Sequence, residues 1–508
     1  MSTRARRAAR LSTLLLALAA PAAAQLITIR TVPVAQGDQF AMFPSHNLGM
    51  GGVSLALADT LLDPFSNPAT GARLGAPRFL GSPAFYNVSS DAGGGRTLPL
   101  GAFTRSGPWY GGLWVALQEV DASRQPSPGG PIFLQDRIAV DPNGLLDGVN
   151  ARSHGNTFVF ATTGKVLAEQ GLSLAGSVLW SGLHAVDGVD MLYAGSEGVR
   201  QRGHDVDARL GLLKEWEGGR SLEAVLLHDR FAMTQDVTYL EFFWDPATQQ
   251  TLQRARLERN LDQTNTWGVH VAYQRPLAAA GWRLGWLATV NRMTHPKIPN
   301  YEIMSIPRDP GESYALNLGL GLSRSAGGTT FGVDALYEPI WSYTWADAVA
   351  PITTVLGSTI PAGGKTIENR FRFSNGLFRM GVTQELGRAG TGARAPSTAL
   401  QLGVVARAIG YRLAQTDNVQ AARRTLRESW VEWTPTWGLS FRGPALEIRY
   451  RGRVTNGTGR PGVGGIGRAE LDNAAGGGRG ILIAPSGPLT LDEVRVVTHQ
   501  VTLSLPLH

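Results

Sequence analysis

Apolar and polar residues alternate one by one along many segments of this chain. Between Leu172 and Leu183, one set of alternate positions carries Leu, Gly, Val and Trp, and the other carries mostly Ser and Ala. Side chains that alternate in this way lie on opposite faces of a β-strand, whereas an amphipathic helix would need a period of 3.6 residues. The same pattern predicts strands around 205–216, 266–274, 282–291, 313–323 and 446–454.

Aromatic residues stand at the ends of the apolar rows, as at Trp180, Trp216, Trp267, Trp282 and Tyr314. The segments are roughly 10 to 13 residues long, which matches a tilted strand crossing a bilayer and exceeds the usual strand of a soluble sheet. Hydrophobic residues make up 43% of the chain and the mean hydropathy is -0.07, as expected when only one face of each strand meets lipid. The 63 glycines and 13 tryptophans fit a barrel with small lumen residues and aromatic girdles.

Short and long connections alternate between these segments, as they do between the periplasmic turns and outer loops of outer-membrane barrels. Short links fall near 105–108, 169–171, 217–220, 276–281, 325–328 and 443–444. Long links are expected at 121–155, 184–203, 232–263, 294–311, 341–370, 413–428 and 456–492. Residues 76–508 are therefore predicted to form an all-β, transmembrane antiparallel barrel of about 16 strands, or 14 if the first hairpin is not a full pair.

The first 24 residues have the layout of a secretory signal peptide. Arg4, Arg6, Arg7 and Arg10 precede an apolar run, and three alanines end at Ala24, where we expect cleavage. Loss of these four arginines lowers the formal net charge from +7 to +3, which removes most of the case for a nucleic-acid partner. The chain has no cysteine, so no disulfide can hold the exported protein together.

A motif of small residues stands ahead of the first strand. The run LGMGG ends at Gly52 and leads to Asp59, and the triplet Asn67, Pro68 and Ala69 follows about eight residues later. By themselves, Gly49, Gly51 and Gly52 predict one turn and Asn67-Pro68 another. Together they resemble the N-terminal hatch signature of the FadL-like outer-membrane barrels, which include long-chain fatty-acid transporters and PorV-type proteins. The resemblance implies that residues 25–75 form a hatch inside the lumen, with the barrel at 76–508.

The resemblance also implies 14 strands and a mode of action. FadL-like transporters capture a hydrophobic ligand at their outer loops and release it sideways through a gap at a kinked strand. Gly111 and Gly112, in the third predicted strand, would form that wall kink. Aromatic residues in the outer loops would form the capture site: Tyr239, Phe242, Phe243, Trp244, Trp341 and Trp345. The alternative explanation for these aromatics is a girdle at the membrane interface.

Several arginines fall on the polar faces of predicted strands. They could contact an anionic head group in the lumen, because the guanidinium fork suits a carboxylate. The alternative is that they pair with lumen carboxylates and fill a plugged interior. The arginines concerned are Arg209, Arg283, Arg449, Arg451 and Arg453.

Catalytic motifs are sparse. Gly462, Gly464 and Gly467 form a GxGxxG in a glycine-rich stretch without the flanking strand and helix of a nucleotide site, so we attribute it to loop composition. The segment 52–56 fails the last position of GxSxG, and no histidine pair forms HExxH. We expect no enzyme activity, no metal and no cofactor.

We therefore expect a bacterial outer-membrane channel for hydrophobic or amphipathic, fatty-acid-like small molecules that works by passive diffusion. Its partners would be outer-membrane lipids, the ligand and the barrel assembly machinery, with no nucleic acid. The alternative is a PorV-like component that docks a secretion-system protein without transport, since the same fold supports both roles.

Overall fold

The computed structural model describes residues 39–40, 42–90, 93–121, 154–186, 198–295, 310–348, 350–388, 396–461 and 491–507. The predicted signal peptide 1–24, residues 25–38 and 41 of the predicted hatch, and the GxGxxG at 462–467 lie outside these ranges. In the part described, no helix has the length and apolar character needed to span a membrane. The helical turns are η1 (Leu48–Met50), α2 (Asp63–Ser66), η2 (Pro68–Arg73) and η4 (Ala168–Gln170).

The strands fall into two sheets, one of 17 strand segments and one of two. The two-stranded sheet consists of β13 (Ile352–Thr353) and β14 (Thr359–Ile360). The large sheet consists of β1 (Arg78–Gly81), β2 (Ala84–Val88), β3 (Gly94–Ser106), β4 (Trp109–Asp121), β5 (His154–Leu167), β6 (Leu172–Leu183), β7 (Gly198–Trp216), β8 (Arg220–Asp245), β9 (Gln250–Pro276), β10 (Trp282–Thr294), β11 (Gly311–Ala326), β12 (Thr329–Asp347), β15 (Lys365–Arg388), β16 (Ser397–Asp417), β17 (Ala422–Arg442), β18 (Glu447–Pro461) and β19 (Leu491–Pro506).

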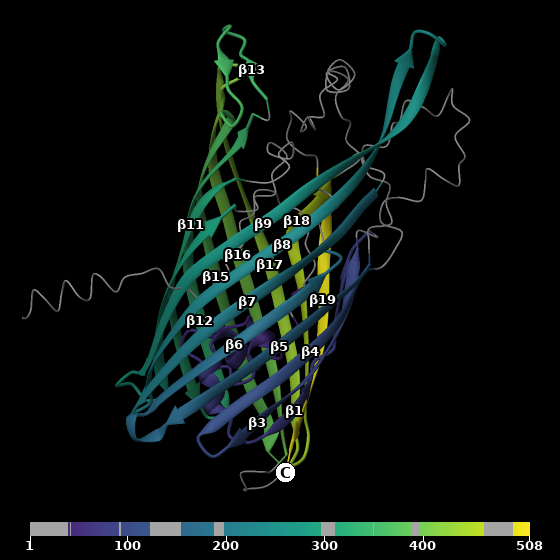
Figure 1. Ribbon diagram of the computed structural model, residues 1–508. Coiled ribbons are helices and arrows are strands. Elements are labelled where there is room, and N and C mark those ends of the chain that lie inside the picture. The colour runs from purple at the N-terminus through teal and green to yellow at the C-terminus, as the bar shows by residue number, and fades with distance from the viewer. Residues whose placement is uncertain are drawn as a thin grey trace, which may run out of the picture.

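The large sheet closes into an antiparallel barrel (Figure 1). From β2 to β12 and from β15 to β19 each strand pairs with the next along the chain, β12 pairs with β15, and β19 returns to β1 and β2. β1 and β2 are two halves of one strand, separated by Ser82 and Pro83. Both halves therefore lie between β3 and β19. The 17 segments therefore occupy 16 positions. The larger of the two predicted counts is right, and the 14 implied by the FadL-like resemblance is not.

The barrel is apolar outside and largely polar inside. On β4, Leu117 is 58% exposed, while its neighbour Gln118 is 3% exposed and faces the lumen. Elsewhere, Leu318 and Leu402 face outward, whereas Asn317 and Gln401 are buried. A soluble sheet would bury the apolar rows, so this arrangement is that of a transmembrane barrel with its leucines in hydrocarbon. The predicted all-β, antiparallel transmembrane barrel is confirmed.

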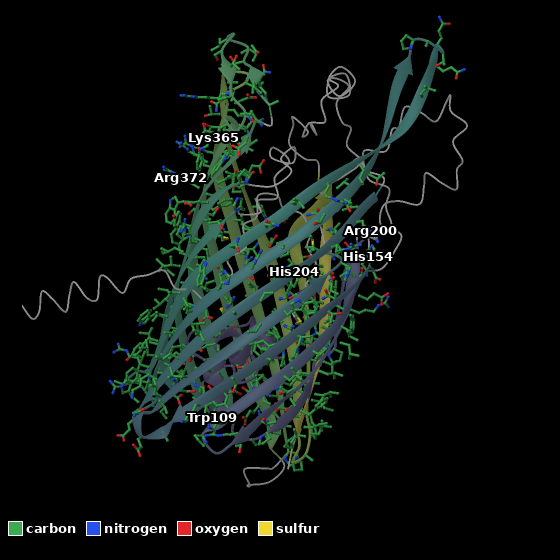
Figure 2. The ribbon with its side chains drawn as sticks, viewed as in Figure 1. Trp109, His154, Arg200, His204, Lys365 and Arg372 are labelled. Atoms are coloured by element: carbon green, nitrogen blue, oxygen red, sulfur yellow. The ribbon has the colours of Figure 1, made fainter. Side chains whose placement is uncertain are left out.

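Aromatic side chains border the apolar band at two levels. Trp109, Trp216 and Trp282 stand beside the short turns, and Figure 2 shows Trp109 at that end. Trp267 and Tyr314 both lie opposite Arg292, which is ten residues along β10 from Trp282. That separation is roughly 33 Å of strand and about 25 Å of membrane thickness at a tilt near 40°. The two levels therefore match the interfaces of one bilayer.

The two rims of the barrel differ in height. The predicted short links are confirmed as turns at one end, for example 107–108, 217–219 and 327–328. At the other end, three segments predicted as long loops are mostly strand: 232–263, 341–370 and 413–428. Above the membrane neither face of a strand needs to be apolar, so these extensions lack the alternation by which strands were recognised. Figure 1 shows the β8–β9 hairpin and the wall of β12 and β15–β17 rising above the body of the barrel.

Leu318→Arg tests whether the outward rows contact lipid. Leu318 is 45% exposed midway along the apolar band of β11, and a cation there should lower the free energy of unfolding by about 2–4 kcal/mol. The control is Leu356→Arg, because Leu356 is 78% exposed between β13 and β14, beyond the band, and should change stability by less than about 0.5 kcal/mol. Urea unfolding in phosphatidylcholine vesicles, followed by tryptophan fluorescence, measures both. Equal losses in the two variants would contradict lipid contact.

Candidate functional site

The segment from Gly49 to Ala56 lies across a band of glycines on the inner wall. Six strands each present an inward glycine to it, and three of these, on β12, β15 and β16, lie directly side by side in the sheet. A Cβ atom on any of the six would press on the hatch segment: at Gly321 it would lie 2.5 Å from Leu55 Cβ, and at Gly332 2.7 Å from Val53 Cγ1. The six glycines are Gly285, Gly321, Gly332, Gly381, Gly403 and Gly438, and we call this band the glycine seat.

Polar side chains of the wall hold the backbone of the same segment. The Thr436 hydroxyl accepts a hydrogen bond from the Gly51 N–H at 2.9 Å and donates one to the Gly49 carbonyl at 3.0 Å. The Ser54 N–H donates to Asp334 Oδ2 at 2.8 Å, and Ser323 donates to the Ala56 carbonyl at 2.9 Å. These contacts satisfy backbone groups that the closely packed lumen removes from water.

Two glycines of the predicted motif make the turn itself possible. Gly51 and Gly52 have φ of +78° and +69°, a region that strains residues with a Cβ atom. The third, Gly49, is buried against Gln401 and Gly438. The LGMGG run is therefore explained by two left-handed turn positions and one close approach to the wall.

Asp59 is the centre of the turn region of the hatch. Its side chain is 1% exposed and accepts hydrogen bonds from the backbone N–H groups of His46, Asn47, Leu61 and Leu62, at 2.9 to 3.2 Å. Ser45 Oγ also donates to it. One carboxylate thus joins two segments of the hatch, since an ionised oxygen pair accepts several donors at once.

The predicted triplet Asn67, Pro68 and Ala69 attaches the hatch to the opposite wall. Asn67 Oδ1 accepts from the Ala69 N–H at 3.1 Å and so caps η2, while Asn67 Nδ2 donates to Glu223 Oε2 at 3.0 Å. The Tyr110 hydroxyl lies 3.3 Å from the Pro68 carbonyl oxygen and 3.1 Å from that of Ala69. A Cβ atom on the facing Gly211 would overlap Asn67 Oδ1.

Ion pairs complete this attachment. Arg73, at the end of η2, pairs with Glu215 and Glu223 at 3.0 Å each. The pKa of Asp63 is raised well above its usual range because the lumen removes the carboxyl from water and because Glu223 and Asp59 lie nearby; Arg73 offsets part of this. The hatch and wall therefore share one network of charges.

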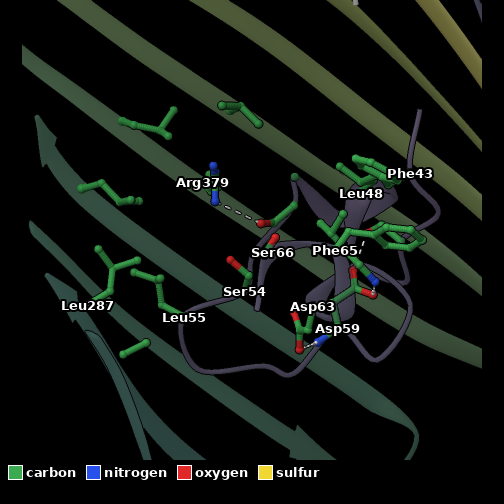
Figure 3. A pocket seen from close by; sticks show the side chains of 18 of the residues that line it. Phe43, Leu48, Ser54, Leu55, Asp59, Asp63, Phe65, Ser66, Leu287 and Arg379 are labelled. Carbon is green, nitrogen blue, oxygen red and sulfur yellow. Dashed lines mark hydrogen bonds between the residues drawn. The ribbon is translucent and has the colours of Figure 1, made fainter. Parts of the chain in front are cut away.

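A cavity of about 650 Å³ lies between the hatch and the wall (Figure 3). One side of its lining is apolar: Leu287, Leu336 and Leu377 pack around Leu55 of the hatch, with Ala272 and Val405 beside them. Figure 3 shows Leu55 and Leu287 on this side and Arg379 pointing from its strand toward the hatch, where it donates to the Gly52 carbonyl at 3.3 Å. The charged part of the lining is balanced, with four arginines and four carboxylates: Arg209, Arg379, Arg407, Arg453, Asp59, Asp63, Glu223 and Glu432.

A second apolar cluster lies nearer the tall rim on the same inner wall. Ile340, Phe371, Phe373 and Tyr411 pack together there with Met293, Ala315 and Leu413. A polar layer separates the two apolar regions, where Asn317 donates to Glu338 at 3.3 Å and Asn375 is buried. The inner wall of β10–β17 is thus apolar, polar and apolar in turn.

The five predicted lumen arginines do not form one anion site. Arg209 binds Asp207 through two nitrogens and the hatch carbonyl of Ser66 at 2.9 Å, and Arg449 donates to Glu447 at 2.6 Å. Arg283 lies at the turn end and donates to the Gly219 carbonyl. Of the five, Arg209 and Arg453 line the cavity, whereas Arg283, Arg449 and Arg451 do not. The alternative interpretation, salt-bridged filling, is correct for Arg209 and Arg449.

Arg379 was missed as a site residue. Arg379 lies on the inner face of β15 together with Phe371, Phe373 and Leu377. Because the other residues of this row are apolar, the sequence pattern gave no sign that the row faces the lumen.

The predicted capture aromatics lie on strands and not in loops. Tyr239, Phe242, Phe243 and Trp244 belong to β8, where they pair with 251–256 of β9, and their side chains fall outside the described structure. Trp341 and Trp345 lie on β12, and Trp341 is exposed on the outer face in line with Tyr314. Trp341 therefore belongs to the aromatic border at the membrane interface, as the girdle interpretation predicts.

The predicted wall kink at Gly111 and Gly112 lies in a continuously paired part of β4. Pairing of β4 with both neighbours runs through these residues without a register shift. A Cβ at Gly112 would lie 2.5 Å from Phe103 Cδ1, and one at Gly111 2.9 Å from the Thr162 carbonyl oxygen. The glycines therefore make room for Phe103 and for the backbone of Thr162, and they open no gap in the strand pairing.

No protein-family model matches this chain, and no curated protein matches it. Similar solved structures include a Pseudomonas aeruginosa FadL homologue, with 12% identity, 93% of this chain and 100% of that chain covered, and a TM-score of 0.43. They also include the CymD monoaromatic hydrocarbon channel, with 10% identity, 93% and 99% covered and a TM-score of 0.39, and a bacterial polysaccharide outer membrane secretin, with 6% identity, 85% and 99% covered and a TM-score of 0.38.

Gly381→Ala tests the glycine seat. Its Cβ would overlap the Met50 carbonyl, and overpacking of this kind should weaken seating by about 1–3 kcal/mol, or roughly 5- to 150-fold in the ratio of unseated to seated molecules. We expect single-channel openings in planar bilayers and trypsin cleavage within the hatch. Gly376→Ala on the same strand is the matched control, because no atom lies within 4 Å of its Cβ position. A Gly381→Ala barrel as closed as the Gly376→Ala barrel would refute the seat.

Proposed function

We propose that this protein is an outer-membrane channel through which hydrophobic or amphipathic small molecules diffuse passively. The observation that carries the proposal is the cavity beside the hatch, in which an apolar wall and charged groups line the same space. Its volume of about 650 Å³ falls in the range of small-molecule sites, which are mostly apolar with a few polar groups.

The balance of charges in the lining determines which part of a ligand contributes most to its binding. Four arginines face four carboxylates, so a head group gains little from net charge and must compete with groups that already attract one another. An apolar ligand that covers the patch around Leu336 removes apolar surface from water, which is favourable. The preferred ligand is therefore defined by its apolar body, with a polar end allowed at the charged side.

The proposed route runs from the tall rim to the hatch. The apolar cluster around Phe373, the polar layer at Glu338 and the cavity wall at Leu377 follow one another down the same strands. A ligand with both apolar and polar parts can form favourable contacts in each layer. Passage then requires the hatch to move off its seat, because hatch residues 49–56 lie against the wall below the cavity.

The proposal includes export through a cleaved signal peptide and insertion in a bacterial outer membrane with the short turns toward the periplasm. The short turns, the aromatic levels about one bilayer apart and the tall opposite rim support this orientation.

One feature favours the docking alternative. The β8–β9 hairpin continues past the last residues paired with β7 and β10, and among the described residues its outer strand edges have no partner, so that a protein partner could use them. Extraction in detergent followed by mass spectrometry separates the two functions. A bound lipid-like molecule would favour transport, and a stoichiometric protein would overturn it.

Leu336→Asn combined with Leu377→Asn tests the cavity wall. Each exchange removes apolar contact of roughly 1.5–3 kcal/mol, so binding of dansyl-labelled undecanoic acid should weaken by at least about tenfold. The matched control is Leu402→Asn, an equal change on the outer face of β16, which should leave binding as in wild type. Fluorescence titration of the detergent-solubilised protein measures the affinities. Equal binding by the cavity variant and the control would remove the cavity as the site.

A further inference from the structure

Three arginines on adjacent strands stand side by side on the outside of the tall wall. Arg372 of β15 lies directly opposite Arg412 of β16, which lies directly opposite Arg427 of β17. Adjacent strands are about 4.8 Å apart, and like charges placed directly opposite one another destabilise a sheet. We call these three residues the arginine row.

The row faces outward. Arg372 shares its face of β15 with Phe378 and Met380, both exposed, whereas Phe371 and Phe373 point inward into the apolar cluster of the lumen wall. Arg412 and Arg427 are likewise exposed, and their alternate neighbours Tyr411 and Leu426 belong to or pack on that cluster. Figure 2 shows Arg372 on the outside of the wall, below Lys365.

Several outward arginines elsewhere on the barrel are paired with carboxylates, and those of the arginine row are not. Arg96 pairs with Glu119 at 2.8 Å, Arg259 with Asp236 at 2.7 Å and Arg292 with Glu312 at 2.7 Å. Within the described residues, Arg372, Arg412 and Arg427 have no salt-bridge partner.

The carboxylates near the row are already engaged. Glu368, further up β15, accepts from Tyr343 and from Asn418 Nδ2 at 3.2 Å. Glu428 lies next to Arg427 in the chain but points inward and accepts from the Tyr411 hydroxyl at 2.5 Å. Two further cations lie higher on β15, where Arg370 lies over the Tyr343 ring and Lys365 over the Trp345 ring. The outer face here has an excess of positive charge.

The height of the row matches the head groups of the outer leaflet. Exposed Tyr337 and Val431 lie in one line across the sheet with Gly376 and Ala408, four residues below the arginines. Four residues correspond to about 13 Å of strand and about 10 Å along the membrane normal at a tilt near 40°. The head-group layer is roughly 5–8 Å thick on each side of the hydrocarbon, and arginine stems are long enough to lower their charge into it.

A strip of small residues leads down the wall from the row. Ser374, Gly376, Ala408, Gly410 and Ser429 are small and lie on the same outer face, and the Cβ position of Gly376 has no atom within 4 Å. Tyr337 stands on one side of this strip, and Val431 and Trp433 stand on the other. A hydrocarbon chain fits along such a strip, while larger side chains border it.

We propose that the arginine row binds the phosphate group of an anionic lipid in the outer leaflet, with one acyl chain lying along the small-residue strip. Neighbouring guanidinium groups can bind phosphate oxygens through paired hydrogen bonds, and the lipid charge relieves the repulsion among the three cations. The site lies outside the barrel and is independent of the channel function proposed above.

The competing explanation is that the arginines protect an open strand edge. In the described part of the chain, the pairing of β17 with β18 reaches only as far as Trp433 with Asn456, and residues 422–432 have no described partner on that side. Charge on such an edge prevents aggregation. This explanation predicts that neutral variants aggregate without any change in lipid binding. It accounts for Arg427 at the edge, but not for Arg372 and Arg412 on the interior strands β15 and β16.

The test uses the full-length barrel in phosphatidylcholine vesicles with or without phosphatidic acid carrying brominated chains. Bromine quenches nearby tryptophans, and Trp433 stands beside the strip, so subtraction of a Trp433→Phe trace isolates the local signal. The variants are Arg412→Gln, the triple variant Arg372→Gln/Arg412→Gln/Arg427→Gln, and the charge-keeping triple lysine variant. Arg230→Gln, at an isolated exposed arginine on β8, is the matched control.

We expect Arg412→Gln to weaken enrichment of phosphatidic acid near Trp433 by roughly fivefold, and the triple glutamine variant to abolish it. The lysine variant should keep most of the enrichment, which also shows that the altered barrel folds, and Arg230→Gln should match wild type. Equal quenching in wild type and the triple glutamine variant would overturn the proposal. So would loss of the signal on addition of millimolar inorganic phosphate, which would indicate a site for soluble anions, and so would aggregation of the glutamine variants with unchanged lipid enrichment.

Discussion

The rest of this structure depends on the contact between the outward apolar rows and the hydrocarbon of the membrane. With no water in the bilayer core, every backbone group must find a partner within the sheet, and only a closed barrel achieves that with strands. Sixteen strand positions meet this demand, with β1 and β2 sharing one of them. Because the apolar side chains face lipid, polar ones such as Asn317 and Gln118 face the lumen, where they must be paired or filled.

Residues 39–40 and 42–75, the described part of the segment predicted to form a hatch, fill part of the lumen. Their backbone lies against glycines of the wall at 49–56, and their polar triplet and Arg73 bind the opposite wall through Glu223. Both attachments use polar groups that would otherwise be buried without hydrogen-bond partners. The same contacts therefore close the lumen and satisfy its polar groups. The cavity is the space that remains between them, and its apolar wall around Leu336 is the part of the lumen that offers contact to a hydrophobic molecule.

Alternation of side chains was enough to predict the barrel, its turns and the parity of most strands, because inside the membrane one face must be apolar. It fails once a strand leaves the bilayer. At 370–373 the alternation of Arg and Phe suggests that phenylalanines face lipid, yet Phe371 and Phe373 face the lumen and Arg372 faces outward. The hatch motif was recognisable because Gly51 and Gly52 need positive φ and Asn67 caps a turn. The wall glycines that receive it are far apart in the sequence, and only pairing brings Gly332, Gly381 and Gly403 together.

The chain has no cysteine, so single cysteines can carry nitroxide labels at chosen positions. The most direct measurement compares labels at Leu318 and at its neighbour Asn317, in vesicles, for collision with oxygen and with a water-soluble nickel chelate. The structure predicts that the Leu318 label collides mainly with oxygen, as in hydrocarbon, and that the Asn317 label, facing the packed lumen, is shielded from both. A Leu318 label as accessible to the nickel chelate as to oxygen would contradict the lipid contact on which the barrel, the hatch and the cavity depend.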